Sequence, residues 1–412
     1  MATGMATQLK DMARSAPRAA RGARPLATWQ EDLIVMAIAF WPITALFFDG
    51  RNHNNKTGQE SFFSFAHIVL YSGMSVFAAY LGLVLAKYQT RAGARPLRGI
   101  VDLQAIPVGY GVAFLGLCLL GIAGPADLIW HSLYGFEVNV EAIISPPHLA
   151  LFFGGLLVSS TGIRSMWAKR DLAPDFRGFL PALMSGILFT AILTFITMYT
   201  SALMTNVGPT SAFVNDIKQN FHDVVSNQTI GLNEGLRGYG DNLFPYHYYT
   251  VSHALASMVI TTLVLLGPTL LILRRWRVPF PAFTVMYLVI GLMNCVMSEY
   301  RDAWLLIPLV IAGLTVDLLQ RTLAAGPNER LSLGGIRLVG PVTAAALWFS
   351  YYAVMAIHLG IGWRPPTWVG ANVLGVMAGF GVAFLVAPPS YGPRLVEGGD
   401  DDLPAEAVAV SD

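Results

Sequence analysis

Long apolar stretches alternate with short polar segments along the whole chain. Three of these stretches, residues 106–126, 179–205 and 338–358, contain no Asp, Glu, Lys or Arg. Each holds about 20 or more residues, which is enough to cross a hydrocarbon core about 30 Å thick. The pattern predicts ten membrane-spanning helices, at residues 31–48, 66–86, 105–126, 145–167, 179–205, 249–273, 279–297, 303–319, 338–358 and 367–388. We therefore predict an all-α fold, a polytopic transmembrane bundle built from helical hairpins.

The composition agrees with a membrane location. Only 12% of the 412 residues are charged, whereas 54% are hydrophobic, and a soluble protein needs about twice that charged fraction to cover its surface. A formal net charge of +1 argues against a nucleic-acid partner. The only cysteines, Cys118 and Cys295, both lie in apolar stretches, which excludes a disulfide scaffold or a Cys-rich metal cluster.

Basic residues predict the orientation and the domain limits. If the ten spans alternate in direction, 20 of the 26 Lys and Arg residues fall on one side and six on the other. The positive-inside rule then places both termini in the cytoplasm and the chain in the inner (plasma) membrane. We expect a cytoplasmic basic arm at 1–30, a transmembrane domain at 31–388 with one long outer segment at 206–246, and a disordered acidic cytoplasmic tail at 389–412.

Histidines gather at the outer ends of the predicted spans. Under this topology all eight fall at outer helix ends or in outer loops, accompanied by several carboxylates. Histidines that only filled a core would scatter in depth, and ionisable groups at membrane depth usually mark a site or a pathway. The distribution predicts a polar vestibule on the outer face, lined by imidazoles and carboxylates.

An internal repeat organises these residues. Each copy reads D-x3-H, then a loop, then H-h-x-L-aromatic-x-G at the start of the next span, and a degenerate third copy follows the long outer segment. The first copy contains Asp49, His53 and His67, the second Asp127, His131 and His148, and the third Asp241, His247 and His253. Three hairpins thus offer an acid and two imidazoles at similar height.

The spacing suits a metal site. Residues at i and i+4 share one helix face, so the Asp and His of each D-x3-H pair can face one point and a His from the next helix can add a third ligand. Two nitrogens and one oxygen with open positions suit Cu, Fe or Zn at a reactive site. Two alternatives stay open: the Asp and His hydrogen-bond each other while Ser64 or Ser145 caps the next helix, or they relay protons without metal.

Three further acids lie close to these motifs in the sequence. Glu137 and Glu141 form another i, i+4 pair between His131 and His148 of the second copy, and Asp241 opens the third copy. They are candidates for orienting the imidazoles or for replacing a ligand. For the glutamates, solvated loop acids are the simpler interpretation.

The Asp49-x3-His53-x13-His67 unit resembles the metal-binding element of the C subunit of copper membrane monooxygenases. In that family an Asp and a His one turn apart, with a His from the following helix, hold a metal in the membrane. The resemblance covers about twenty residues per copy and implies Asp49, His53 and His67 as ligands, with Asp127, His131 and His148 in the second copy. The Asp-Gly-x-x-His-Asn tip and the Ser-Pro-x-His helix start are also similar to a bacterial polytopic membrane family, a likeness that implies no activity.

Three functions compete at this stage. The first is a membrane metalloenzyme, a copper- or iron-dependent oxidoreductase acting on a small or lipophilic substrate, with a zinc hydrolase as its variant. The second is a transporter or ion-handling protein for metal or protons, although polar groups at the bilayer midplane are sparse. The third is an accessory subunit that packs against other membrane subunits.

Overall fold

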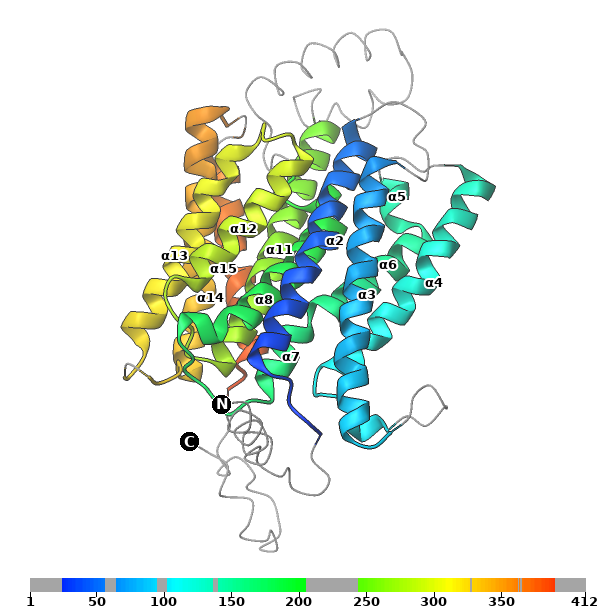
Figure 1. Ribbon diagram of the computed structural model, residues 1–412. Helices are drawn as coiled ribbons and strands as arrows, with labels where there is room; N and C mark the ends of the chain where they lie inside the picture. Colours follow the sequence, from blue (N-terminus) through cyan, green and yellow to red (C-terminus); the bar gives the residue numbers. More distant parts are fainter. Residues whose placement is uncertain are drawn as a thin grey trace, which may run out of the picture.

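The computed structural model describes residues 24–55, 64–94, 102–135, 140–204, 244–326, 328–361, 363 and 365–389 (Figure 1). Every regular element in these ranges is a helix. Most of the basic arm, the acidic tail and nearly all of the long outer segment lie outside the described residues, so the predictions made for them stay predictions.

The predicted all-α transmembrane bundle is confirmed. Nine helical spans in the described ranges are long and apolar enough to cross a membrane. They are α2 (Trp29–Asn55), α3 (Phe65–Arg91), α4 (Tyr110–Tyr134), α6 (Pro146–Ser159) continued by α7 (Thr161–Trp167), α8 (Phe176–Ile196), α11 (Phe244–Arg275), α13 (Leu306–Leu323), α14 (Leu333–His358) and α15 (Pro365–Val386). The tenth predicted span is the shorter apolar helix α12 (Ala282–Met297), of 16 residues.

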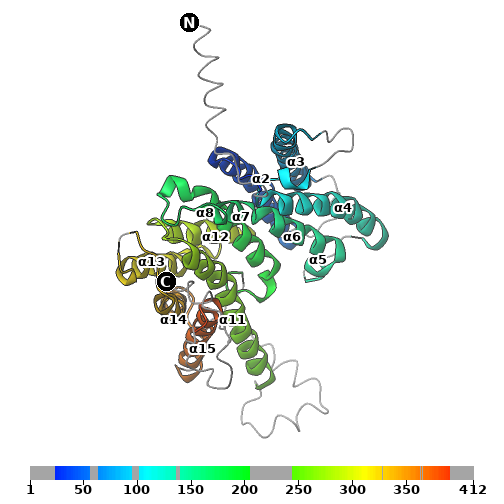
Figure 2. The same cartoon turned by 90° about the horizontal axis from the view of Figure 1, so that it is seen from below.

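The helices form two groups around a buried centre. Seen along the bundle axis, α2 to α6 lie on one side and α13 to α15 on the other, with α8 and α12 between them (Figure 2). In the most apolar 18-residue stretch of helix α8, 72% of the residues are buried, whereas the corresponding share in the peripheral helix α3 is 22%. The helices α2 to α6 carry both complete copies of the repeat, as the hairpins α2–α3 and α4–α6.

Each of these hairpins closes on a glycine of the repeat. A Cβ at Gly73 of α3 would lie 2.8 Å from Trp41 Cδ1 and 2.9 Å from the Pro42 nitrogen of α2. A Cβ at Gly154 of α6 would lie 2.8 Å from a Leu120 side-chain carbon of α4. Only glycine permits such close helix packing, which brings the His at the start of the second helix near the end of the first.

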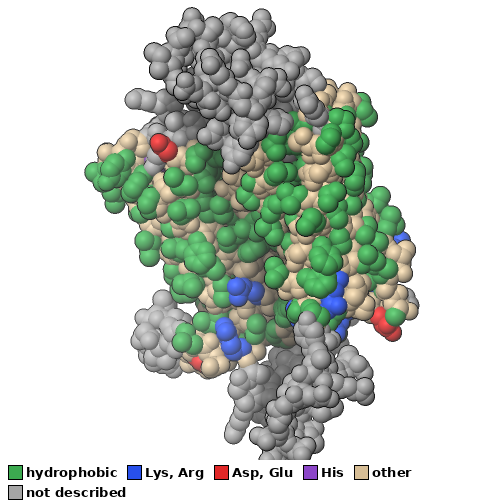
Figure 3. All heavy atoms as spheres, turned by 180° about the vertical axis from the view of Figure 1, so that it is seen from behind, with side chains coloured by type: hydrophobic (Ala, Val, Ile, Leu, Met, Phe, Trp, Pro, Cys, Tyr) green, Lys and Arg blue, Asp and Glu red, His purple; other side chains and the backbone are tan. Residues whose placement is uncertain are grey.

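The lateral surface is apolar, and basic side chains gather toward one end of it (Figure 3). Several of them bind helix ends there: Arg274 Nη1 donates to the carbonyl of Val386 at 2.7 Å, and Arg337 Nε donates to that of Ala387 at 2.7 Å. Cations are favourable at the C-terminus of a helix because its last carbonyls are unpaired. Helix α2 begins and α15 ends at this same end (Figure 1).

A buried carboxylate holds the basic end together. Asp32 of α2 is fully buried and accepts hydrogen bonds from Tyr110 Oη at 3.0 Å, Ser165 Oγ at 2.9 Å and Lys169 Nζ at 2.6 Å. These partners come from α4, α7 and the segment after it, so one carboxylate connects three parts of the chain. A buried charge needs such full pairing, and this acid is structural.

Candidate functional site

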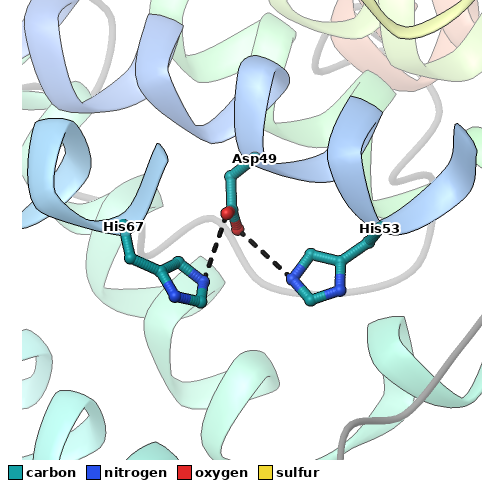
Figure 4. Close-up of side chains that lie close together, drawn as sticks. All are labelled: Asp49, His53 and His67. Atoms are coloured by element: carbon teal, nitrogen blue, oxygen red, sulfur yellow. Dashed lines mark ion pairs between the residues drawn. The ribbon is translucent and has the colours of Figure 1, made fainter. Parts of the chain in front are cut away.

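The first Asp/His group lies where α2 ends and α3 begins. Helix α2 continues through Gly50 to Asn55, so Asp49 and His53 stand one turn apart on the same face, as the i, i+4 spacing requires. Asp49 Oδ2 lies 3.7 Å from His53 Nε2, and Asp49 Oδ1 lies 3.1 Å from His67 Nε2. Figure 4 shows the two imidazoles on either side of the carboxylate. Asp49 and His67 are both buried.

The second group repeats this arrangement between α4 and α6. Asp127 Oδ1 lies 3.4 Å from His131 Nε2 on its own helix and 3.1 Å from His148 Nε2 across the hairpin. Asp127 is only 2% exposed. In each group the three ligand atoms lie within 4.8 Å of one another. Of the described Asp, Glu, His and Cys residues, these two sets are the ones close enough to share a metal ion.

Hydrogen bonds fix which nitrogen of the second group faces the carboxylate. His131 Nδ1 lies 3.1 Å from the carbonyl oxygen of Gly135, and His148 Nδ1 contacts that of Ala142. Because a carbonyl only accepts, both Nδ1 atoms donate. In a neutral imidazole the Nε2 atom then carries the lone pair, and both Nε2 atoms point toward Asp127. Metal-ligating histidines are commonly oriented by such a contact to a backbone carbonyl.

Two imidazole nitrogens and a carboxylate oxygen that converge form a donor set that could hold a cation. Asp49 Oδ1 and Asp127 Oδ1 are buried and accept no well-aligned hydrogen bond, although Nε2 atoms lie 3.1 Å away. Zn–N bonds of about 2.0–2.1 Å and Zn–O bonds of about 2.0–2.2 Å in a tetrahedral site place the donor atoms about 3.3 Å apart. The separations of 3.1 and 3.4 Å in the second group fit a metal ion of this size.

Only one of the two predicted caps forms. Ser64 Oγ accepts a hydrogen bond from the His67 backbone N–H at 3.3 Å, which fixes the start of α3 beside Asp49. Ser145 stands at the N-cap of α6, but it makes no side-chain capping bond and its buried hydroxyl has no partner. Pro146 and Pro147 at the first two helical positions carry no backbone N–H, so only the His148 N–H at the third position remains as a capping donor, and it makes no bond to Ser145 Oγ.

The two groups open into one pocket. Side chains of both groups line it, and it is partly open to the outside. The polar contributors to its wall are Asp49, His53, His67, Tyr71, Asp127 and His148. The remaining wall is almost entirely apolar and comes mainly from α2, α3, α4, α6 and α8, with smaller contributions from α5 and from Met198 after α8. The polar vestibule predicted from the sequence is therefore an apolar pocket with a polar end.

Two aromatic residues of the site were missed as functional candidates. Tyr71 follows His67 by one turn, with ring centroids 6.0 Å apart, and Phe152 follows His148 by one turn at 6.3 Å. Both line the pocket, and Tyr71 lies near enough to Asp49 and Asp127 to sense both charges. The aromatic position of the H-h-x-L-aromatic-x-G motif was the available signal. It was read as part of the repeat pattern, without a role of its own.

Of the remaining predicted residues, the two with described side chains, Glu141 and His253, do not join either group. Glu141 lies on the short helix α5 (Val140–Ile144) and is exposed. His253 is exposed on α11. His247 belongs to α11 but its side chain is outside the described part of the structure, as are Glu137 and Asp241. The third copy of the repeat therefore stays a prediction.

No protein-family model, curated protein or solved structure matches the chain. The resemblance to the copper monooxygenase subunit is thus untested. Fold and site together define a polytopic helical membrane protein with two Asp/His groups that can each hold a metal ion.

Proposed function

We propose that this chain is a membrane metalloprotein, and that with copper or iron bound it acts as an oxidoreductase on a small lipophilic substrate. The observation that carries the proposal is the fixed orientation of the second group, where backbone carbonyls hold both Nδ1 atoms and leave both Nε2 atoms facing Asp127. A set of residues that served only as mutual hydrogen-bond partners would align its donors with the carboxylate oxygen, and Asp127 Oδ1 has no aligned donor.

The donor set favours a reactive metal over a structural one. Each group supplies two imidazole nitrogens and one carboxylate oxygen, which leaves positions open for substrate or water. Copper or iron at such a set supplies a change of redox state, whereas zinc supplies Lewis acidity and an activated water. A zinc hydrolase is therefore the variant of this proposal, and the identity of the metal decides between the two.

The surroundings of the groups support a lipophilic substrate. The pocket wall below the ligands consists of side chains such as Leu46, Met74, Leu117 and Phe195, which exclude water and favour apolar molecules. Gly50 allows the close approach of the Phe195 ring beside Asp49, since a Cβ there would lie 2.6 Å from it. The ligands thus lie against a mostly apolar wall, which suits a lipophilic substrate.

The predicted location is part of the proposal. The gathering of basic side chains at the end where α2 begins and α15 ends supports cytoplasmic termini by the positive-inside rule. The Asp/His groups then lie at the outer leaflet of the inner membrane. A transport role or an accessory role beside other membrane subunits would share the metal sites, and only a turnover assay separates them.

Metal analysis tests the proposal. We expect protein purified in mild detergent to contain about two metal ions per chain, because two complete ligand sets are present. His53→Ala and His131→Ala should each lower this to about one, and the double variant should lower it to near zero. Glu141→Gln, which changes an exposed acid outside both groups, is the matched control. Near-zero metal in the wild-type protein after reconstitution with copper, iron and zinc would rule the proposal out.

A further inference from the structure

The pocket has a polar end and an apolar body, which is a shape for an amphiphile. Both carboxylates and three of the imidazoles lie at one end. Among the wall residues of α3, α4 and α6, those farthest along the helix from the ligands are Phe77, Leu117 and Val158. Each of these lies ten residues along its helix from a ligand, namely from His67, Asp127 and His148 respectively. Val158 and its ligand His148 both lie on α6. On all three helices the pocket wall therefore changes from a proposed metal ligand at one end to an apolar side chain ten residues away.

The length of the pocket follows from the same spacing. Ten residues of α-helix rise about 15 Å, which is half of a hydrocarbon core about 30 Å thick. The wall lined by these helices is therefore about 15 Å long along the helix axis, about half the thickness of a hydrocarbon core. That distance matches a single extended hydrocarbon chain of medium length within one leaflet.

The pocket lies between two hairpins that barely touch across it. Helix α3 packs along α2, and α4 packs along α6, whereas α3 and α4 make only sparse contact with each other. Both nevertheless line the pocket, through Leu70 and Met74 on α3 and through Leu117 and Leu120 on α4. The outward sides of these two helices are apolar and exposed, for example at Val76 and Phe114. In a membrane such surfaces face lipid chains, so α3 and α4, which make few contacts with each other, stand between the pocket and the bilayer.

We propose that the pocket binds a single-chain lipid with a small oxygen-bearing head, such as a medium-chain alcohol, which enters from the outer leaflet between α3 and α4. The chain of about twelve carbons lies along the wall from Leu70 to Phe77, and the head group lies between Asp49 and Asp127. The role of the head group rests on the proposed function. The bound lipid gives that function a substrate class.

Two other kinds of ligand fit less well. A water-soluble substrate would leave the apolar body of the pocket unfilled. A phospholipid carries a second hydrocarbon chain and a large charged head, whereas the polar end of the pocket is formed by two carboxylates and three imidazoles. The experiment includes both as competitors.

Photolabelling tests the inference on the full chain in lipid nanodiscs. The probe is dodecanol with a diazirine at the end of its chain, and labelled residues are identified by mass spectrometry. We expect labelling at Phe77, Leu117 or Val158. Unlabelled dodecanol should suppress it at least tenfold, and octadecanol, glycerol and dilauroyl phosphatidylcholine should suppress it less. Labelling confined to outward residues such as Val76, or equal competition by all four compounds, would overturn the inference.

A pocket-filling variant gives a second, independent readout. Met74→Trp places a large side chain in the wall of α3, whereas the control Leu83→Trp changes a residue of the same helix that is 68% exposed and outside the pocket. We expect at least tenfold less labelling in Met74→Trp only, with the metal content of both variants unchanged. If the wild-type protein binds metal but none of its pocket residues is labelled, the lipid-binding inference is wrong and the proposed function is unaffected. Labelling of metal-free protein that takes up no metal on reconstitution would instead contradict the proposed function and leave the binding site in place.

Discussion

His148 Nε2 lies 3.1 Å from Asp127 Oδ1, and His67 Nε2 lies at the same distance, 3.1 Å, from Asp49 Oδ1. Each pair joins the end of one helix to the start of the next, across loops of different length. Equal distances in both copies show that the hairpin geometry, with its glycine contact below the ligands, sets the position of the third ligand. The loop does not.

Asp127→Asn should remove metal from the second group. An amide is a weaker ligand than a carboxylate and carries no negative charge to balance a cation, so we expect the affinity of this site to fall about 100-fold or more. Competition with a chromogenic chelator measures the affinity of each site. The control Glu141→Gln should leave the metal affinity unchanged, because Glu141 is exposed and belongs to neither group. Equal affinities in wild type and Asp127→Asn would contradict the assigned ligand set.

Gly73→Ala should separate α3 from α2. The new Cβ would lie 2.9 Å from the Pro42 backbone nitrogen, which cannot move aside as a side chain can. We expect a loss of about 1–3 kcal/mol in the free energy of unfolding and loss of metal from the first group only. Gly82→Ala on the same helix meets no atom within 4 Å and should be neutral or stabilising by about 0.5–1 kcal/mol. Thermal unfolding in detergent and metal analysis measure both effects, and similar behaviour of the two variants would refute the packing argument.

Asp32→Ala should destabilise the protein without affecting the metal sites. The substitution leaves Lys169, Ser165 and Tyr110 without their common acceptor. Breaking a buried ion pair by removing one partner costs about 3–5 kcal/mol. The exposed Asp171 makes a local bond to the Ala173 backbone N–H, so Asp171→Ala should cost about 1 kcal/mol or less. A large decrease in metal content at unchanged stability would show that Asp32 is not purely structural.

The ion pair between Arg51 and Glu299 gives a prediction for pH. Arg51 Nη2 lies 2.7 Å from Glu299 Oε1, and this hydrogen bond lowers the pKa of Glu299 below its ordinary value of 4.5. Because the folded-state pKa is the lower one, the contribution of the pair is complete above pH 4.5 and disappears as the pH falls through the folded value. Wild type and Glu299→Gln should therefore differ slightly in Tm at neutral pH and converge in acid, since the pair is solvent-exposed. A difference that grows on acidification would contradict this assignment.

The sequence predicted the fold well because hydrophobic length decides it. All ten predicted spans coincide with helices, and the one that falls short of a full span, α12, has only 16 residues. The convergence of Asp49 with His53 followed from the one-turn spacing within a helix. The approach of His67 and His148 also followed, because a hairpin must bring the start of its second helix back to the end of its first.

The shared pocket was not predictable in the same way. Nothing within either copy of the repeat says that the two hairpins face each other, since that depends on how α2 and α6 pack against α8. The orientation of His131 and His148 depends on the carbonyls of Gly135 and Ala142, and backbone carbonyls leave no trace in a sequence. The structural role of Asp32 is likewise set by partners up to 137 positions away.

Tyr71 and Phe152 occupy equivalent places in two otherwise matching hairpins. A phenol can give up a proton or an electron, and a phenyl ring can do neither under ordinary conditions. The two halves of the pocket are therefore chemically unequal, although their ligands are the same. The same ligand set therefore stands beside a redox-active and acidic side chain in one hairpin and beside an inert ring in the other.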